Sequence, residues 1–312
     1  MFLENVTELR EESGKSHLSD ADYIVQWFQE HEYEASYFVV SARDFGSPSH
    51  RRRLFFLAVH VGRDSSPQCR QTSLKAAFAE VDTVLKELKV DACPLEQFLI
   101  EPDTLQMWAQ TSQWPLYNKR ENSAGKVLAF KSEHCQLYRA ADLTYPLPEE
   151  SVPTYLKHVL GDCSERMQES LIYLDAIYPL AEHSCEVEGL DLNASLPRLL
   201  GKTSPWRMSF LPTLVTTSRI LLRWRDRATR LPNYRFMLGL ESMECMGFHL
   251  GWIKDSDKHM IGHAAFVDMA GNAFNGFALV SFFLAWFCCC PKQIGFTDTE
   301  AKVLVVDDSE SS

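Results

Sequence analysis

The sequence has no excess of positive charge. Its 312 residues include 31 Lys and Arg against 42 Asp and Glu, which gives a formal net charge of −11. Proteins whose whole surface binds nucleic acid are usually basic, so this composition argues against that class. A local basic surface is still compatible with it, because six arginines gather between positions 219 and 235.

The sequence also shows neither the cysteine pattern of a disulfide framework nor the pattern of a secretory leader. The nine cysteines are an odd number scattered along the chain, which is typical of reduced thiols. The first residues turn acidic within four positions, and no basic segment with an apolar core and a small-residue cleavage site follows. We therefore expect an intracellular protein.

No apolar run reaches the length of a membrane span. The most hydrophobic stretch, 276–290, ends at Pro291, whereas a spanning helix needs about 20 predominantly apolar residues. We expect a helix buried against a sheet. The alternative is membrane association through this stretch, which would make the protein depend on detergent for solubility.

What the chain does have is a clear pattern of elements near its start. Apolar residues recur within 23–28 at the spacing of an amphipathic helix, and Ser19 and Asp20 precede them as candidate caps. Residues 33–42 and 52–61 are rich in aromatic and apolar residues, which predicts two buried strands with a turn between them.

The rest of the chain gives weaker patterns. From 62 to about 204 short helices alternate with acidic and proline-bearing loops, so we expect a separate lobe or a large insertion. His259 and His263 lie four apart, as metal ligands on a helix can, but no partner completes a set and we expect solvated histidines.

Four short motifs follow one another along the chain. They are E-N-V at 4–6, F-G-S-P-S-H-R-R-R at 45–53, an arginine-to-G-F stretch at 235–248, and G-N at 271–272. In this order they resemble the DNA (cytosine-5) methyltransferase family. That family has E-N-V, F-G-x-P-Q-x-R-x-R, a variable target recognition domain, an R-x-L-T-x-x-E motif leading to G-F, and a final G-N-S/A motif.

The resemblance implies an α/β protein, namely a partial class I (Rossmann-like) S-adenosylmethionine-dependent methyltransferase fold with an inserted target recognition lobe. The strands around Phe38 and Phe56 would form an antiparallel hairpin. The implied domains are a catalytic remnant at 1–61, a target recognition domain at 62–204, a return to the catalytic domain with a closing helix at 205–290, and a disordered acidic tail at 291–312.

The resemblance also assigns a pocket for the target base. Carbon 5 of cytosine is alkylated only when the ring is electron-rich, which the family achieves by adding a thiolate to carbon 6. A protonated carboxyl at N3 stabilises the charge that accumulates on the ring. By resemblance Glu4 has this role, and Arg51 and Arg53 hold the base's carbonyl oxygen and the geometry around the glutamate. The alternatives are an ordinary strand-end glutamate and a solvated charge cluster.

The resemblance assigns only part of the cofactor site and assigns no nucleophile. By resemblance Asn5, Gly271 and Asn272 contribute to the S-adenosylmethionine site. The family's F-x-G-x-G loop and Pro-Cys nucleophile precede E-N-V, and neither motif occurs in this sequence. Cys69 and Cys93 stand in the wrong local order, and we expect plain thiols there.

We therefore expect the C-terminal portion of a DNA (cytosine-5-)-methyltransferase, with an incomplete cofactor site and no activity as an isolated chain. The alternative is a non-catalytic protein of the same origin that binds DNA or a methyltransferase subunit. Expected partners are DNA and a complementary chain with the N-terminal half. A nuclear location follows if the source is eukaryotic.

The arginine-rich stretch is the candidate DNA contact. Four arginines there surround Trp224: Arg219, Arg223, Arg225 and Arg227. In a family that acts on DNA they would bind phosphates, and binding would then depend on salt. The alternative is a solvated charged face.

Overall fold

The computed structural model describes most of the chain. The described residues are 1–11, 18–61, 67–100, 124–146, 148, 150, 152–182, 186–200, 206–208, 210–254 and 261–289. They form two compact units. The first contains Met1–Ser47, Arg51–Ala92 and the described residues from Phe274 onward, and the second contains Pro48–His50 and Cys93–Ala273.

The first unit is built on a three-stranded antiparallel sheet. Its strands are β1 (Phe2–Val6), β2 (Tyr33–Ser41) and β3 (Arg52–His60), in the order β1-β3-β2. Phe38 of β2 lies opposite Phe55 of β3, and Tyr37 lies opposite Phe56, so the predicted antiparallel hairpin is confirmed. Aromatic and apolar side chains alternate between the two faces, and each face buries its own set.

Helix α1 (Asp20–Glu30) covers one face of this sheet. The Ser19 hydroxyl accepts a hydrogen bond from the Asp22 N–H, and the Asp22 carboxylate accepts one from the Ser19 N–H, which confirms Ser19 as the cap. The buried Ala21 of the helix packs with Leu54 and Phe56 of β3. The short 3-10 helices η1 (Thr7–Arg10) and η2 (Ala42–Asp44) follow β1 and β2.

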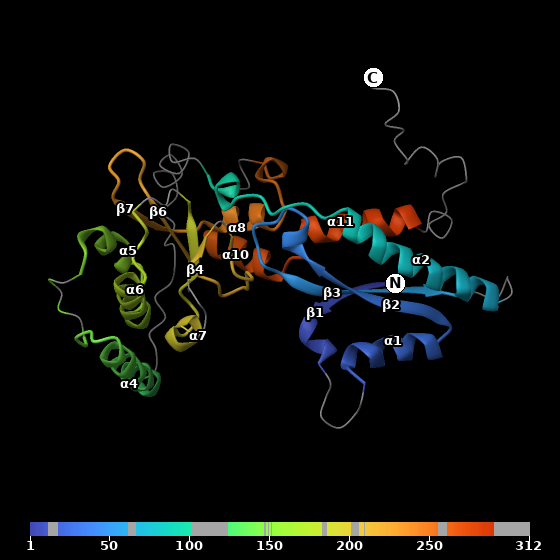
Figure 1. Ribbon diagram of the computed structural model, residues 1–312, viewed down its shortest axis with the longest axis horizontal. Coiled ribbons are helices and arrows are strands. Elements are labelled where there is room, and N and C mark those ends of the chain that lie inside the picture. The colour runs from blue at the N-terminus through green and yellow to red at the C-terminus, as the bar shows by residue number, and fades with distance from the viewer. Residues whose placement is uncertain are drawn as a thin grey trace, which may run out of the picture. The chain divides into compact units, whose positions relative to one another are not determined.

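Helices α2 (Pro67–Glu87) and α11 (Gly276–Cys289) cover the opposite face (Figure 1). The Phe282 ring lies 5.4 Å from the Phe38 ring and 5.1 Å from the Phe55 ring, so α11 adds a large aromatic surface to the core. The predicted closing helix against the sheet is therefore confirmed. By length and composition, His263–Cys289 is long and apolar enough for a membrane span, but its described backbone is interrupted at 273–275.

The second unit has a four-stranded antiparallel sheet in the order β5-β4-β6-β7. Its strands are β4 (Glu188–Asp191), β5 (Arg207–Met208), β6 (Ile220–Arg225) and β7 (Pro232–Phe236). Its helices are η3 (Leu95–Phe98), α4 (Ala124–Ala140), η5 (Thr154–Leu156), α5 (Lys157–Leu160), α6 (Glu165–Ile177), α7 (Leu196–Leu200), α8 (Gly239–Cys245), η6 (Leu250–Trp252) and α10 (His263–Asn272).

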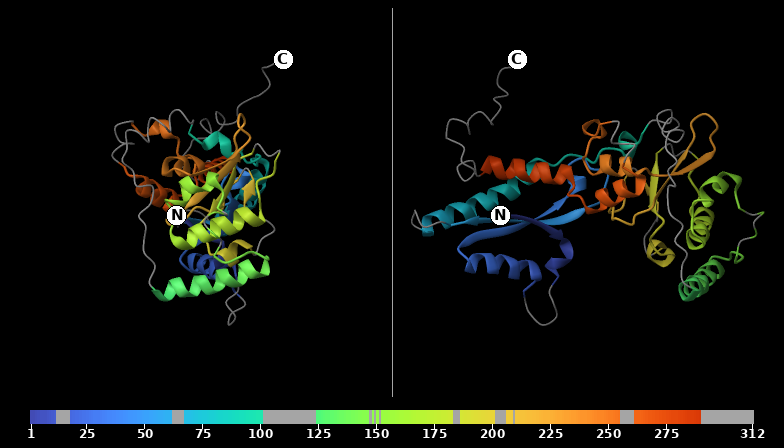
Figure 2. Two further views of the ribbon diagram at one scale, coloured as in Figure 1. Left: turned by 90° about the vertical axis from the view of Figure 1, so that its left-hand side faces the viewer. Right: turned by 180° about the vertical axis from the view of Figure 1, so that it is seen from behind.

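Two cores lie on the two faces of that sheet. Leu221 of β6 packs with α6 and α7, while its neighbour Leu222 packs with α8 and α10. Figure 2 shows these strands between the two groups of helices. The middle of the chain is mostly helical, as predicted, but β4 was not foreseen. Its four residues have no alternating pattern and become a strand by pairing with β6.

The packing units and the predicted domains have different bounds. Helix α2, which falls within the predicted recognition domain, belongs to the first unit, and β6 to α10 belong to the second. The units are defined by contacts and the predicted domains by function, so the predicted division stays a prediction. The predicted disordered tail, 291–312, lies outside the described residues.

Candidate functional site

The first unit brings Glu4, Arg51 and Arg53 together. Glu4 of β1 lies opposite Phe55, and Arg53 lies opposite Val6, so both side chains point to the same face of the sheet at neighbouring positions. Arg51 precedes β3 by one residue, and an alternating backbone directs it to that same face. Residues about fifty positions apart thus meet because β1 and β3 are paired in this register.

Glu4 and Arg53 are close but poorly aligned. Arg53 Nε lies 3.2 Å from Glu4 Oε1, and their side chains are 17% and 15% exposed. The two atoms are an ion pair by distance, yet Glu4 Oε1 is buried and accepts no hydrogen bond among the described residues. Arg53 Nη1 instead donates to the backbone carbonyl of Arg52 at 2.8 Å. The carboxyl therefore keeps an acceptor that its own surroundings do not use.

Burial dominates the electrostatics of this cluster. Loss of water raises the pKa of Glu4 above its ordinary value, although the Arg51 and Arg53 guanidinium groups oppose the shift. Burial, with the nearby Arg53 charge, lowers the pKa of Arg51 to about 10, so this group is still charged at neutral pH. A carboxyl that tends to keep its proton beside a fixed cation can donate a hydrogen bond to a neutral acceptor.

The turn between β2 and β3 holds the arginines in place. The Ala42 N–H donates to the Arg51 carbonyl at 2.9 Å, which closes the turn across its base. Gly46 has a φ of 90°, a backbone conformation that side chains with a Cβ adopt rarely. Ser49 stands where the family has glutamine. It is buried, and its backbone forms an isolated β-bridge with Leu211. The Phe-Gly motif is therefore a structural requirement for presenting Arg51.

Sequence reasoning missed Asn275, which fixes the same turn. This side chain is buried, donates to the Ser47 hydroxyl at 3.1 Å, and accepts from the Ala278 N–H at 3.1 Å. It therefore caps α11 and ties that helix to the turn. An asparagine directly before an apolar helix is the signal that could have revealed it.

The three predicted cofactor residues are not all in one unit. Asn5 is exposed on the sheet face opposite Glu4, and its Oδ1 accepts from the Val6 N–H at 2.8 Å. Gly271 and Asn272 end α10 in the second unit. A Cβ on Gly271 would lie 2.1 Å from the Thr216 nitrogen, so the glycine admits a close approach of protein backbone.

Arg223, one of the four predicted DNA contacts, is buried. Its Nε donates to Glu188 Oε2 at 2.6 Å, its Nη1 donates to the Tyr178 carbonyl at 2.7 Å, and its guanidinium lies 3.9 Å from the centre of the Trp206 ring. A phosphate contact would require this ion pair to open. Arg223 is therefore the predicted contact that the geometry supports least.

The other three arginines differ in exposure. Arg219 is partly buried, and Arg225 donates to the backbone carbonyls of Leu180, Ala181 and Arg230. Arg227 is exposed in the turn between β6 and β7. It is the predicted contact whose charge faces solvent most openly.

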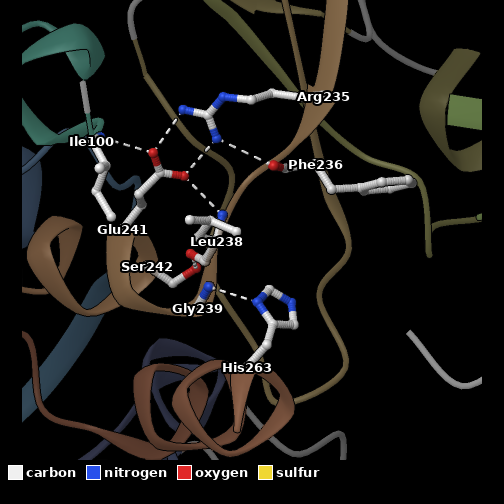
Figure 3. A network of polar contacts seen from close by, with 8 residues as sticks. All are labelled: Ile100, Arg235, Phe236, Leu238, Gly239, Glu241, Ser242 and His263. Carbon is white, nitrogen blue, oxygen red and sulfur yellow. Dashed lines mark hydrogen bonds and ion pairs between the residues drawn. The ribbon is translucent and has the colours of Figure 1, made fainter. Parts of the chain in front are cut away.

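Glu241 and Arg235, from the arginine-to-G-F motif, form a saturated clamp (Figure 3). The two Arg235 Nη groups donate to the two Glu241 oxygens at 2.7 and 2.6 Å. The same oxygens accept from the N–H groups of Ile100 and Leu238 at 2.9 and 2.7 Å. Glu241 is fully buried and caps the start of α8, so this motif holds the second unit together.

His263 corrects the prediction of a solvated histidine. Its Nδ1 accepts from the Gly239 N–H at 2.9 Å, and the residue is 3% exposed (Figure 3). Burial lowers its pKa to about 4, so the ring is neutral at physiological pH, as an accepting Nδ1 requires. His259 lies outside the described residues.

Comparison with known proteins identifies the family. The model of the C-5 cytosine-specific DNA methylase family matches residues 1–275 and so includes all four motifs. A similar solved structure is the crystal structure of S. pombe Dnmt2 methyltransferase, at 10% sequence identity and a TM-score of 0.36, over 95% of this chain and 67% of that one. No curated protein matches. The family match spans most of the chain. The chain therefore belongs to the C-5 cytosine-specific DNA methylases and has their α/β, S-adenosylmethionine-dependent methyltransferase fold.

Proposed function

We propose that this chain supplies the base pocket of a DNA cytosine-5 methyltransferase, in which Glu4, Arg51 and Arg53 hold a cytosine rotated out of the duplex. A base inside the stack is out of reach for chemistry at carbon 6, so the family's reaction needs this rotation. The observation that carries the proposal is the meeting of the three side chains on one sheet face, with an unused acceptor on Glu4.

Glu4 acts as the proton donor in this proposal. Cytosine N3 is an acceptor, and a protonated carboxyl can donate to it while its other oxygen accepts from the exocyclic amine. Attack at carbon 6 pushes negative charge toward N3, which strengthens that hydrogen bond as the reaction proceeds. The raised pKa of Glu4 favours the protonated form that this role needs.

Arg51 and Arg53 supply positive charge and donors in the same proposal. A guanidinium has donors only, so it suits the carbonyl oxygen of cytosine and the phosphates beside an everted base. In this proposal Arg51, which is 5% exposed, contacts the base, while Arg53 stays beside Glu4. The charge of Arg51 limits how far burial raises the pKa of Glu4.

The methyl donor of this family is S-adenosylmethionine, which supplies an activated methyl group when bound. The predicted cofactor residues fit it poorly, because Gly271 closes on protein backbone and Asn5 faces away from Glu4. The proposed role of this chain is therefore limited to its own base-binding residues. A site shared with a complementary chain stays part of the proposal.

The nucleophile is also unassigned. No Pro-Cys or F-x-G-x-G motif occurs in the sequence. Cys163 and Cys245 are buried, and burial raises the pKa of Cys245 well above its usual range, which disfavours the reactive thiolate. We therefore propose that the chain alone binds the base without methylating it. A non-catalytic DNA-binding protein is the second candidate, and the same cysteine environments favour it.

The test compares duplexes that carry one unpaired cytosine or one unpaired thymine. We expect the wild-type chain to prefer cytosine, and Glu4→Ala to weaken cytosine binding by about tenfold or more, because two neutral hydrogen bonds of about 1 kcal/mol each are lost. Glu8→Ala, an exposed glutamate in η1, is the matched control and keeps the preference. Equal binding of both duplexes by the wild-type chain would overturn the pocket.

A second arm measures transfer of labelled methyl groups from S-adenosylmethionine to the cytosine duplex. We expect no incorporation by the chain alone. Incorporation would overturn the predicted inactivity and leave the base pocket standing. Binding without cytosine preference and without incorporation would favour the non-catalytic candidate.

A further inference from the structure

A second candidate site lies in the first unit, away from Glu4. A groove of about 380 Å³ runs between β2 and α2. It is lined by residues 34–38 of β2 and by four residues of α2: Lys75, Phe78, Ala79 and Asp82. Its volume is in the range of ligand sites, which is roughly 300–1,000 Å³.

The wall on the β2 side is the edge of the sheet. Successive side chains of a strand point to opposite faces, so five consecutive residues can line one groove only along the backbone edge. β2 is the outer strand of the sheet and pairs with β3 on one side. Half of its backbone N–H and C=O groups therefore face the groove, and a strand edge of this kind can accept a further strand.

Glu34 contributes a buried carboxylate to the wall of the groove. It is 2% exposed, and its Oε2 has no hydrogen-bond partner among the described residues. A buried carboxylate is strongly unfavourable without a donor or a cation. Asp82 adds a second carboxylate, which Lys86 pairs at 2.5 Å, and the Lys75 side chain is exposed. The most buried ionisable side chain among the residues that line the groove is thus an acceptor that a cation would satisfy.

The groove is separate from the cytosine cluster. Val59, which lies opposite Glu34, is six residues along β3 from Arg53. At the rise of a strand this is about 20 Å, so the two sites occupy opposite ends of one sheet. An occupant of the groove would leave Glu4 accessible.

We propose that this groove binds an extended basic peptide as an added strand along β2, with a lysine or arginine side chain reaching Glu34. The strand edge supplies main-chain hydrogen bonds, Phe78 and Ala79 supply apolar contact, and Glu34 supplies selectivity for a cation. The proposal does not depend on methyltransferase chemistry.

The test uses the full chain and the acetylated, amidated peptide Thr-Val-Lys-Val-Thr. We expect it to bind, and we expect replacement of its lysine by norleucine to weaken binding at least about tenfold, because a charge-assisted contact is lost. Glu34→Gln should weaken the lysine peptide equally. Glu32→Gln, an exposed glutamate next to β2, should leave binding unchanged. Hydrogen exchange at residues 34–38 should slow when the peptide is bound.

Several results would overturn the proposal. One is no measurable binding of the lysine peptide, and another is equal binding by wild type and Glu34→Gln. If n-butylammonium binds as tightly as the peptide, the groove is a small-cation site and the added strand is wrong. Without peptide, Glu34→Gln should raise the unfolding midpoint, because a buried unpartnered charge is removed. A lowered midpoint would show a structural partner for Glu34 and contradict the proposal.

Discussion

The Glu4–Arg53 pair of the first unit and the Glu241–Arg235 pair of the second differ in how completely the carboxylate is satisfied. In the second unit, Glu241 accepts four hydrogen bonds, two of them from Arg235. In the first, Glu4 lies 3.2 Å from Arg53 without an aligned hydrogen bond. A saturated carboxylate has no capacity left for a ligand, whereas Glu4 retains an acceptor and a raised pKa. The difference separates a structural pair from a candidate functional one.

The largest expected effect on stability comes from breaking the Glu241–Arg235 pair. Glu241→Ala leaves Arg235 and two backbone N–H groups without their acceptor, and should lower the free energy of unfolding by about 3–5 kcal/mol, as loss of one partner of a buried ion pair does. Urea unfolding followed by circular dichroism measures it. Glu182→Ala, an exposed glutamate in the same unit, should change it by less than about 0.5 kcal/mol. Equal midpoints for both variants would contradict a structural role for Glu241.

The next effect tests whether the second unit's motif glycine is structural. Gly271→Ala places a Cβ 2.1 Å from backbone, which should lower the free energy of unfolding by about 1–3 kcal/mol, as overpacking does. Gly161→Ala is the control, because its Cβ would meet nothing closer than 3.9 Å. Unchanged stability of Gly271→Ala together with weaker S-adenosylmethionine binding would favour the predicted cofactor role over a structural one.

A smaller effect is a pH dependence carried by Glu4. Its pKa is raised in the folded protein, so between the ordinary value of 4.5 and the raised value the folded state binds more protons than the unfolded state. Stability relative to Glu4→Gln should therefore fall as pH rises through that window and stay constant above it. Paired urea titrations at stepped pH measure the difference. No change in this window, together with a rise in stability as pH increases toward 4.5 from below, would mean that Glu4 behaves like a saturated carboxylate.

The smallest effect concerns the arginine stretch. Arg227→Ala should leave the unfolding midpoint unchanged and reduce the slope of DNA affinity against salt by about one, as loss of one phosphate contact does. Fluorescence anisotropy with a duplex at stepped salt concentrations measures the slope. Arg223→Ala is the contrasting variant and should lower stability, because it leaves Glu188 buried alone. An unchanged slope for Arg227→Ala would remove this residue from the DNA surface.

Local patterns in the sequence were sufficient for much of the first unit. Ser19 before an amphipathic run, two aromatic strands around a glycine turn, and an apolar helix near the end all give signals within a short window. The motif order predicted which carboxyl and guanidinium groups would be candidates. The pairing of β1 with β3 then explains why Glu4 and Arg53 meet.

The partners and burial of several polar residues could not be predicted from the sequence, because they depend on elements that are distant along the chain. Arg223 is buried because β6 pairs with β4, which places it opposite Glu188, and no local pattern encodes that partner. Glu34 is a polar residue within a predicted buried strand, and it is buried because α2 covers its face of the sheet. Asn275 is important through Ser47, which lies far away in the chain. In each case the environment of a polar group depends on an element distant in sequence.

The most direct test of the central claim is a titration of the Glu4 carboxyl itself. Carbon-13 chemical shifts of the glutamate side chains would be followed against pH, with Glu4→Gln to assign the signal. We expect a pKa above the ordinary value of 4.5, and a further rise in the pKa when Arg51 is replaced by methionine, because a nearby positive charge is then lost. A pKa at or below 4.5 would show that the arginines saturate Glu4, and would contradict its role as a proton donor to cytosine.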